Sequence, residues 1–174
     1  MRLFEYIHQG GPIMYVLLGL NVIGFAIMLS KFITYNQEKK QTDSTASRLA
    51  EKLGQNQSEN IKDSNTIIEM AKQEVSLEIN QMEKGLNTVK VIASISPLLG
   101  LLGTVIGVLI AFRVMSQTGL TNPAAFAQGI SMALITTVGG MIVAIPHYVG
   151  HNYLIGMLDR IAMTLEQKLI SKLL

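Results

Sequence analysis

The stretch "PLLGLLGTVIGVLIAF", Pro97–Phe112, decides the class of this chain. It is apolar enough to lie in lipid, yet it contains three glycines, one proline and one threonine. A helix that only had to cross a bilayer would do better with leucine throughout. In lipid, small residues let two helix backbones approach closely, and such contact holds membrane helices together. The stretch therefore predicts a membrane helix that packs against a neighbour.

Three windows of the sequence are long enough to cross about 30 Å of hydrocarbon, which takes roughly 20 helical residues. They are Gly11–Ser30, Val91–Phe112 and part of Val114–Leu158, and none contains Asp, Glu, Lys or Arg. The third helix is expected to begin at Pro123, with Asn122 as its N-cap. The windows predict an all-α membrane protein with three transmembrane helices.

Composition excludes several classes of function. The chain has 174 residues, 49% hydrophobic and 15% charged, with a mean hydropathy of +0.37. It has no cysteine, which excludes disulfides, thiol chemistry and cysteine-ligated metal. A net charge of +2 without a basic patch argues against nucleic acid. Because the spans hold no residue pair at a catalytic spacing, we expect neither an enzyme nor a cofactor.

The basic residues predict how the chain crosses the membrane. Residues 31–90 hold nine of the fourteen Lys and Arg, and the tail after Leu158 holds three more. By the positive-inside rule, these segments are cytoplasmic, whereas the N-terminus and the loop at 116–122 lie on the outer side of the membrane. A signal peptide is the alternative for the N-terminus, but Glu5 and the lack of a small-x-small cleavage site favour a short amphipathic helix.

Seven segments are expected, in chain order. They are a periplasmic amphipathic segment (1–10), transmembrane helix 1 (11–33), a cytoplasmic helical loop (34–89), transmembrane helix 2 (90–115), a periplasmic loop (116–122), transmembrane helix 3 (123–153) and a cytoplasmic C-terminal helix (154–174).

Apolar residues at helical spacing predict that helices 2 and 3 extend into the cytoplasm. Ahead of the second span they recur every seven residues, and we predict one helix from Ile61 to Met115, roughly 80 Å long, although Gly85 weakens it. Residues 36–60 form either a short helix or a connector. Both stripes suit packing within one chain or a barrel between subunits. The stripes are Ile61, Ile68, Val75, Ile79, Met82, Leu86 and Val89, and Leu154, Leu158, Ile161, Leu165 and Leu169.

Small residues line one face of each of the last two spans, which predicts a tightly packed helix pair. In the second span this face holds Gly100, Gly103, Thr104, Gly107 and Ala111; in the third it holds Gly129, Ala133, Thr136 or Thr137, Gly140 and Ala144.

Two threonines and two prolines need more than packing to explain them. Thr104 and Thr137 either bond to a carbonyl one turn back or line a polar path. An interhelical hydrogen bond averages only about 0.6 kcal/mol, so stability alone barely accounts for them. Pro97 and Pro146 each remove a backbone hydrogen bond and bend their helices, which would suit a pore mouth or an ordinary kink.

Proton-carrying membrane proteins normally need an ionisable group in the path, and the windows of the three spans contain no Asp, Glu, Lys or Arg, which leaves His147 and His151 as the nearest candidates. His147 and His151 lie one turn apart, but no third ligand is near, so we expect a structural role at the interface and no metal. If protons move along this protein, the carboxylate must come from another chain.

Three motifs together resemble the MotA/TolQ/ExbB family of inner-membrane, ion-driven motor subunits, and its ExbB branch most. They are "HQGGPIMYVLL", "SPLLGLLGTVIGVLIAF" and "GISMALITTVGGMIVAIPHYVGHNYL". The resemblance implies a homopentamer whose second and third helices line a pore, with Thr104 and Thr137 at the positions of the family's pore threonines. Inside would lie an ExbD-like single-span partner with an intramembrane Asp, coupled to a TonB-like protein.

One position departs from the family pattern. Similar proteins carry a glutamate early in the third span, where this chain has Met132 in "SMALITT". A TolQ-like subunit for envelope maintenance is the alternative within the family. Outside it, a membrane scaffold that conducts nothing would use the same glycine stripes for packing alone.

Overall fold

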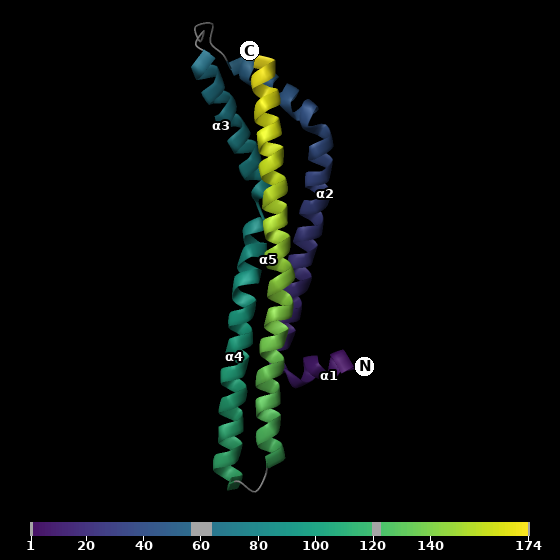
Figure 1. Cartoon of the computed structure of the whole chain (residues 1–174), viewed down its shortest axis with the longest axis vertical. Helices are drawn as coiled ribbons and strands as arrows, with labels where there is room; N and C mark the ends of the chain where they lie inside the picture. Colours follow the sequence, from purple (N-terminus) through teal and green to yellow (C-terminus); the bar gives the residue numbers. More distant parts are fainter. Residues whose placement is uncertain (1, 57–63, 120–122, 174) are drawn as a thin grey trace. The chain divides into compact units, whose positions relative to one another are not determined.

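In the computed structural model, residues 2–56, 64–119 and 123–173 are described, and they form five helices (Figure 1). The predicted N-cap Asn122 and the first seam residue Ile61 lie outside the described residues. The helices are α1 (Arg2–Gln9), α2 (Gly11–Asn56), α3 (Ser64–Glu83), α4 (Leu86–Thr118) and α5 (Pro123–Leu173).

Three of these helices, α2, α4 and α5, are long and apolar enough to cross a membrane. This agrees with the three windows seen in the sequence. The chain is an all-α, multi-pass membrane protein. Between α1 and α2 the chain turns at Gly11, which has a φ of 67° that side-chain-bearing residues rarely adopt.

The chain divides into two compact units. The first unit comprises Met1–Ile27 and Thr88–His151, and the second comprises Met28–Asn87 and Asn152–Leu174. In the first unit, Leu17 of α2, Ile92 of α4 and Val143 of α5 form a buried apolar cluster. The three apolar helices α2, α4 and α5 therefore contact one another at this cluster.

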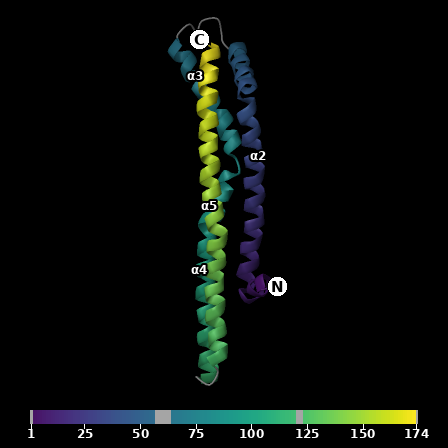
Figure 2. The ribbon, with the colours of Figure 1, turned by 45° about the vertical axis from the view of Figure 1, so that its right-hand side comes forward.

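The second unit buries the apolar stripes that the sequence predicted. Val75 of α3 and Leu165 of α5 pack with Leu49 of α2, and a second cluster surrounds Tyr35 and Leu158. The heptad seam and the C-terminal stripe thus pack against helices of the same chain. The polar segment from residue 36 to Asn56 belongs to α2, which Figure 2 shows as one unbroken helix.

The prediction of one helix from Ile61 to Met115 is wrong. The chain leaves the helix after Glu83 and begins α4 at Leu86, with a turn between them. Gly85 adopts a φ of 93°, which a residue without a Cβ can do at little cost. The period-seven pattern continues across this break because both sides of the turn pack on the same neighbours, so apolar periodicity did not reveal the turn.

The last turn of α3 is held by side chains of α2. The last carbonyls of a helix lack intrahelical donors. The carbonyl of Met82 accepts hydrogen bonds from Lys31 Nζ at 2.8 Å and from Tyr35 Oη at 2.9 Å. A lysine cation at a helix C-terminus is also favoured by the helix dipole. These two contacts supply donors to a backbone carbonyl that the helix break at Gly85 leaves without a partner in its own helix.

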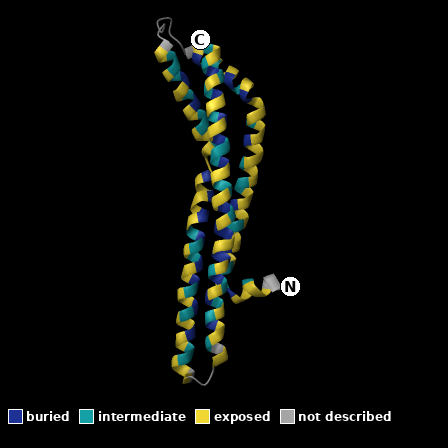
Figure 3. Cartoon of the chain, in the orientation of Figure 1, coloured by how far each residue is buried: buried dark blue, intermediate teal, exposed yellow. Residues whose placement is uncertain are grey.

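Large apolar side chains remain exposed along the spans, where Figure 3 shows yellow segments on α4 and α5. On α4, Leu101, Val105 and Leu109 are 57%, 60% and 59% exposed. In a membrane protein such faces contact lipid or other membrane helices. This chain therefore offers apolar surface to its surroundings on the same helix that packs on α5.

Candidate functional site

Within the first unit, α4 and α5 meet backbone to backbone. A Cβ added to Gly140 would lie 2.5 Å from the carbonyl oxygen of Ser96 and 3.1 Å from Gly100 Cα. A Cβ on Gly100 would lie 2.9 Å from the Thr136 carbonyl oxygen. Real Cβ atoms almost never come this close to backbone, so neither position has room for a side chain.

The same contact continues along both helices. A Cβ on Gly107 would lie 2.8 Å from the carbonyl oxygen of Gly129, and a Cβ on Gly129 would lie 2.7 Å from Ala111 Cβ. A Cβ on Gly103 would overlap the side chain of Thr136. The packed face extends from Gly129 to Gly140, which lies eleven residues further along α5, roughly 16 Å at 1.5 Å per residue.

The adjacent threonines Thr136 and Thr137 of α5 donate their hydrogen bonds to different helices. Thr136 is buried, and its Oγ1 donates to the carbonyl of Ala133 in its own helix at 2.8 Å. Thr137 is half-buried, and its Oγ1 donates across to the carbonyl of Gly100 in α4 at 3.3 Å. The sequence left open which of the two belongs to the packed face; Thr136 lies inside it, and Thr137 bridges the helices at its edge.

Thr104 is satisfied locally. Its Oγ1 donates at 2.6 Å to the carbonyl of Leu101, three residues back in the same helix. Within the described residues, Thr104 and Thr137 share no hydrogen bond. Each hydroxyl bonds to a different backbone carbonyl of α4, and both residues are half-buried.

The two prolines lie inside helices that continue past them, Pro97 in α4 and Pro146 in α5. Ser96, next to Pro97, is fully buried and donates to the carbonyl of Ile92 at 2.7 Å. The carbonyl oxygen of Ser96 faces Gly140. Pro97 thus stands directly beside the close contact of the helix pair.

His147 is buried in the first unit, whereas His151 is half-exposed. The His147 ring lies edge-on to Phe25 with centroids 5.0 Å apart, and Nδ1 donates to the carbonyl of Val143 at 2.7 Å. Nε2 has no hydrogen-bond partner among the described residues. Those residues also include no cluster of three metal-ligating side chains. The sequence did not reveal this burial between helices.

Gly24 makes room for that ring, and a substitution there tests the contact. A Cβ on Gly24 would overlap Nε2 and Cδ2 of His147. We expect Gly24→Ala to lower the free energy of unfolding by about 1–2 kcal/mol, in the range of overpacked cores. In a His147→Ala background the same change should cost much less, because the ring is gone and only Ile92 Cδ1, the end of a side chain, remains close at 3.2 Å. SDS-induced unfolding of the four proteins measures this coupling. An equal cost in both backgrounds would contradict the contact.

The position that departs from the family pattern lines a cavity of about 370 Å³ in the first unit. Met132 shares this cavity with Gln9, Gln128 and Ser131. These side chains offer amide and hydroxyl groups but no carboxylate. Among the residues that the structure describes, none that lines this cavity is acidic.

Two pKa shifts occur beyond the expected spans, both in the second unit. Burial, with a smaller contribution from the charge of Glu83, raises the pKa of Tyr35 to about 12, so its hydroxyl keeps the proton that it donates to Met82. The hydrogen bond from Lys168 Nζ, 2.8 Å away, and the charge of Lys168 hold the pKa of Asp43 below its usual range. Asp43 is exposed, so this pair adds little stability.

Three helices are apolar enough to cross a membrane, and two of them pack backbone to backbone through glycines. These features define a multi-pass helical membrane protein. Residues 27–167 match the model of the MotA/TolQ/ExbB proton channel family. The chain belongs to this family, as its three motifs suggested.

Individual relatives point to the ExbB branch. The chain is 40% identical over 91 residues to the biopolymer transport protein exbB1 of Vibrio cholerae, covering 52% of this chain and 40% of the relative. It is 37% identical over 90 residues to the biopolymer transport protein ExbB of Aquifex aeolicus, covering 52% and 60%. With ExbB of Salmonella typhimurium the identity is 42% over 71 residues, covering 41% and 29%. The chain thus spans 60% or less of the length of these relatives.

Proposed function

We propose that this chain is the channel subunit of an inner-membrane motor that is driven by the proton-motive force. One observation carries the proposal: α4 and α5 pack together through glycines along segments that contain no Asp, Glu, Lys or Arg, and a hydroxyl bridge runs between them from Thr137 to Gly100. Membership of the proton channel family supports it. The ExbB names of the relatives favour energising TonB-dependent transport across the outer membrane over envelope maintenance.

The assembly in this proposal is a homopentamer, with α4 and α5 of each copy around a central pore. Leu101, Val105 and Leu109 are exposed on α4 of the single chain, and such apolar faces suit neighbouring copies, a partner helix and lipid. Thr104 and Thr137 face the pore in this arrangement. Helices of the second unit extend into the cytoplasm, and the N-terminus is periplasmic, as the distribution of Lys and Arg favours.

The proton carrier in this proposal is a partner. The spans hold no Asp or Glu, and Met132 stands where similar proteins carry a glutamate. A dimer of an ExbD-like single-span protein inside the pore supplies an intramembrane Asp. The hydroxyls of Thr104 and Thr137 face this Asp, and the work passes to a TonB-like protein.

Affinity purification of the tagged chain from the membranes of its own host tests the proposal, with native mass spectrometry of the eluate. The expected mass contains five 19.0 kDa chains and a small single-span protein with an Asp in its span. A monomer or dimer without such a partner would overturn the proposal and favour a non-conducting scaffold.

A further inference from the structure

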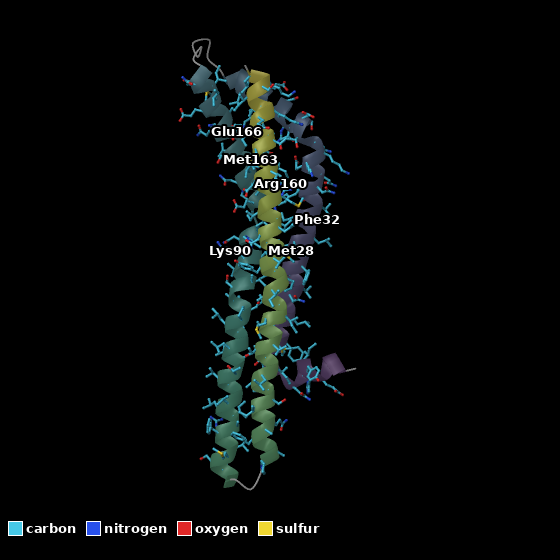
Figure 4. The ribbon with its side chains drawn as sticks, viewed as in Figure 1. Met28, Phe32, Lys90, Arg160, Met163 and Glu166 are labelled. Atoms are coloured by element: carbon cyan, nitrogen blue, oxygen red, sulfur yellow. The ribbon has the colours of Figure 1, made fainter. Side chains whose placement is uncertain are left out.

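A cavity of about 300 Å³ lies between α2 and α5 within the second unit. Its lining includes Phe32, Asn36 and Lys39 of α2 and Tyr153, Arg160 and Thr164 of α5. Two of these side chains are aromatic and two are cationic. Figure 4 labels Phe32 and Arg160, one from each helix.

The two cations of this cavity lack acidic partners in the described part of the chain. Four other basic residues of the unit are paired: Arg48 with Glu78, Lys52 with Glu74, Lys72 with Glu166 and Lys168 with Asp43. Lys40, Lys84 and Lys172 form no ion pair with a described residue either, but they do not line the cavity. Lys39 and Arg160 form no such pair, and both are exposed. The acids next to them in sequence do not line the cavity, and Glu38 accepts a hydrogen bond from Thr45. An anion can therefore reach two uncompensated positive charges.

The position of the cavity relative to the membrane follows from where two stretches without Asp, Glu, Lys or Arg end. The uncharged stretch of α2 ends at Ser30, and that of α5 ends at Leu158. Phe32 and Tyr153 lie close to these ends, with ring centroids 6.4 Å apart. Aromatic side chains favour the membrane–water interface, and basic side chains just beyond it attract anionic headgroups. The cavity thus has an aromatic portion near the hydrocarbon and a cationic portion facing water.

We propose that this cavity binds the phosphodiester headgroup of an anionic phospholipid. Arg160 supplies a guanidinium fork that matches two phosphate oxygens, and Lys39 supplies a second charge. The start of the acyl chains lies against Phe32 and Tyr153. This site needs only that α2 and α5 leave the membrane here, so it stands apart from the proposed channel function.

Lipid titration of the purified full-length chain, with any copies and partners that remain bound, tests the site. Native mass spectrometry counts bound phosphatidylglycerol and, separately, phosphatidylcholine with the same acyl chains. The variants are Lys39→Gln, Arg160→Gln and their combination. Lys40→Gln is the matched control, because it removes one charge from the next residue of α2, which is exposed and does not line the cavity.

The proposal predicts tighter binding of phosphatidylglycerol than of phosphatidylcholine. Each cavity variant should raise the dissociation constant for phosphatidylglycerol roughly fivefold, and the combination roughly twentyfold or more. Lys40→Gln should change it less than twofold, and Arg160→Lys should recover much of the loss because it keeps the charge. Equal weakening by Lys40→Gln, or equal binding of the two lipids, would overturn the site. Displacement of the lipid by inorganic phosphate at similar concentration would assign it to a soluble anion instead.

Discussion

Gly140→Ala is expected to lower the free energy of unfolding by about 2 kcal/mol, the usual cost of overpacking. The new Cβ would lie 2.5 Å from the Ser96 carbonyl oxygen and 3.1 Å from Gly100 Cα. Both neighbours are backbone atoms, which cannot rotate away as a side chain can. The helices α4 and α5 must therefore separate, and every contact along the pair weakens. SDS-induced unfolding of the purified chain, followed by far-UV circular dichroism, measures the effect.

Gly19→Ala is the matched control for this prediction. Gly19 lies in α2, it is exposed, and a Cβ there would meet nothing within 4 Å. Because alanine is a better helix former than glycine, this change is expected to be neutral or to stabilise by up to about 1 kcal/mol. The two substitutions should thus have opposite signs. A Gly140→Ala protein as stable as Gly19→Ala would contradict the close contact between α4 and α5.

Thr137→Val is expected to abolish proton-driven transport, or reduce it at least about tenfold, while changing stability little. Valine keeps the shape of threonine and removes the hydroxyl that donates to Gly100 at 3.3 Å. Loss of an interhelical hydrogen bond in a membrane costs only about 0.6 kcal/mol on average. A large functional loss with a small stability change would separate a role in the proton path from a role in packing. Uptake of a TonB-dependent substrate by cells that express each variant is the measurement.

Thr136→Val provides the comparison at the next residue. The Thr136 hydroxyl bonds to Ala133 of its own helix, so its removal should leave transport close to the wild-type rate. Thr137→Ser keeps the hydroxyl and should retain most of the activity. If the Thr137→Val protein still transports, the Thr137 hydroxyl has no role in the proton path, and the non-conducting scaffold is favoured.

Much of the fold follows from local pattern. The three charge-free windows predicted the three apolar helices, because a span needs its length and its apolar composition in one continuous segment. The apolar pattern did not predict that the helix ends at Glu83 and resumes at Leu86. A helix that resumes after a short turn can keep the same apolar period when both parts pack on the same neighbours, and here Met82 is capped by Lys31 and Tyr35 from far along the chain.

The site was less predictable than the fold. Small residues at helical spacing identified the face between α4 and α5, but neighbouring residues differ by 100° around a helix. Only the packing of α4 on α5 shows that Thr136 lies inside the contact face and that Thr137 lies at its edge. The burial of His147 depends on Gly24, more than a hundred residues away, and the cavity beside Arg160 also needs two distant segments. Such contacts leave no periodic signal in the sequence.

The central proposal is that this chain lines a proton path and that another chain supplies the acid. Proton flux into liposomes with a pH-sensitive dye inside, under an imposed membrane potential, tests it most directly. The chain alone should give no flux above empty liposomes, since the windows of its three spans hold no Asp, Glu, Lys or Arg. The complex purified with its single-span partner should conduct protons, and replacing the partner's intramembrane Asp by Asn should stop the flux. Equal proton flux through the chain alone would contradict the account.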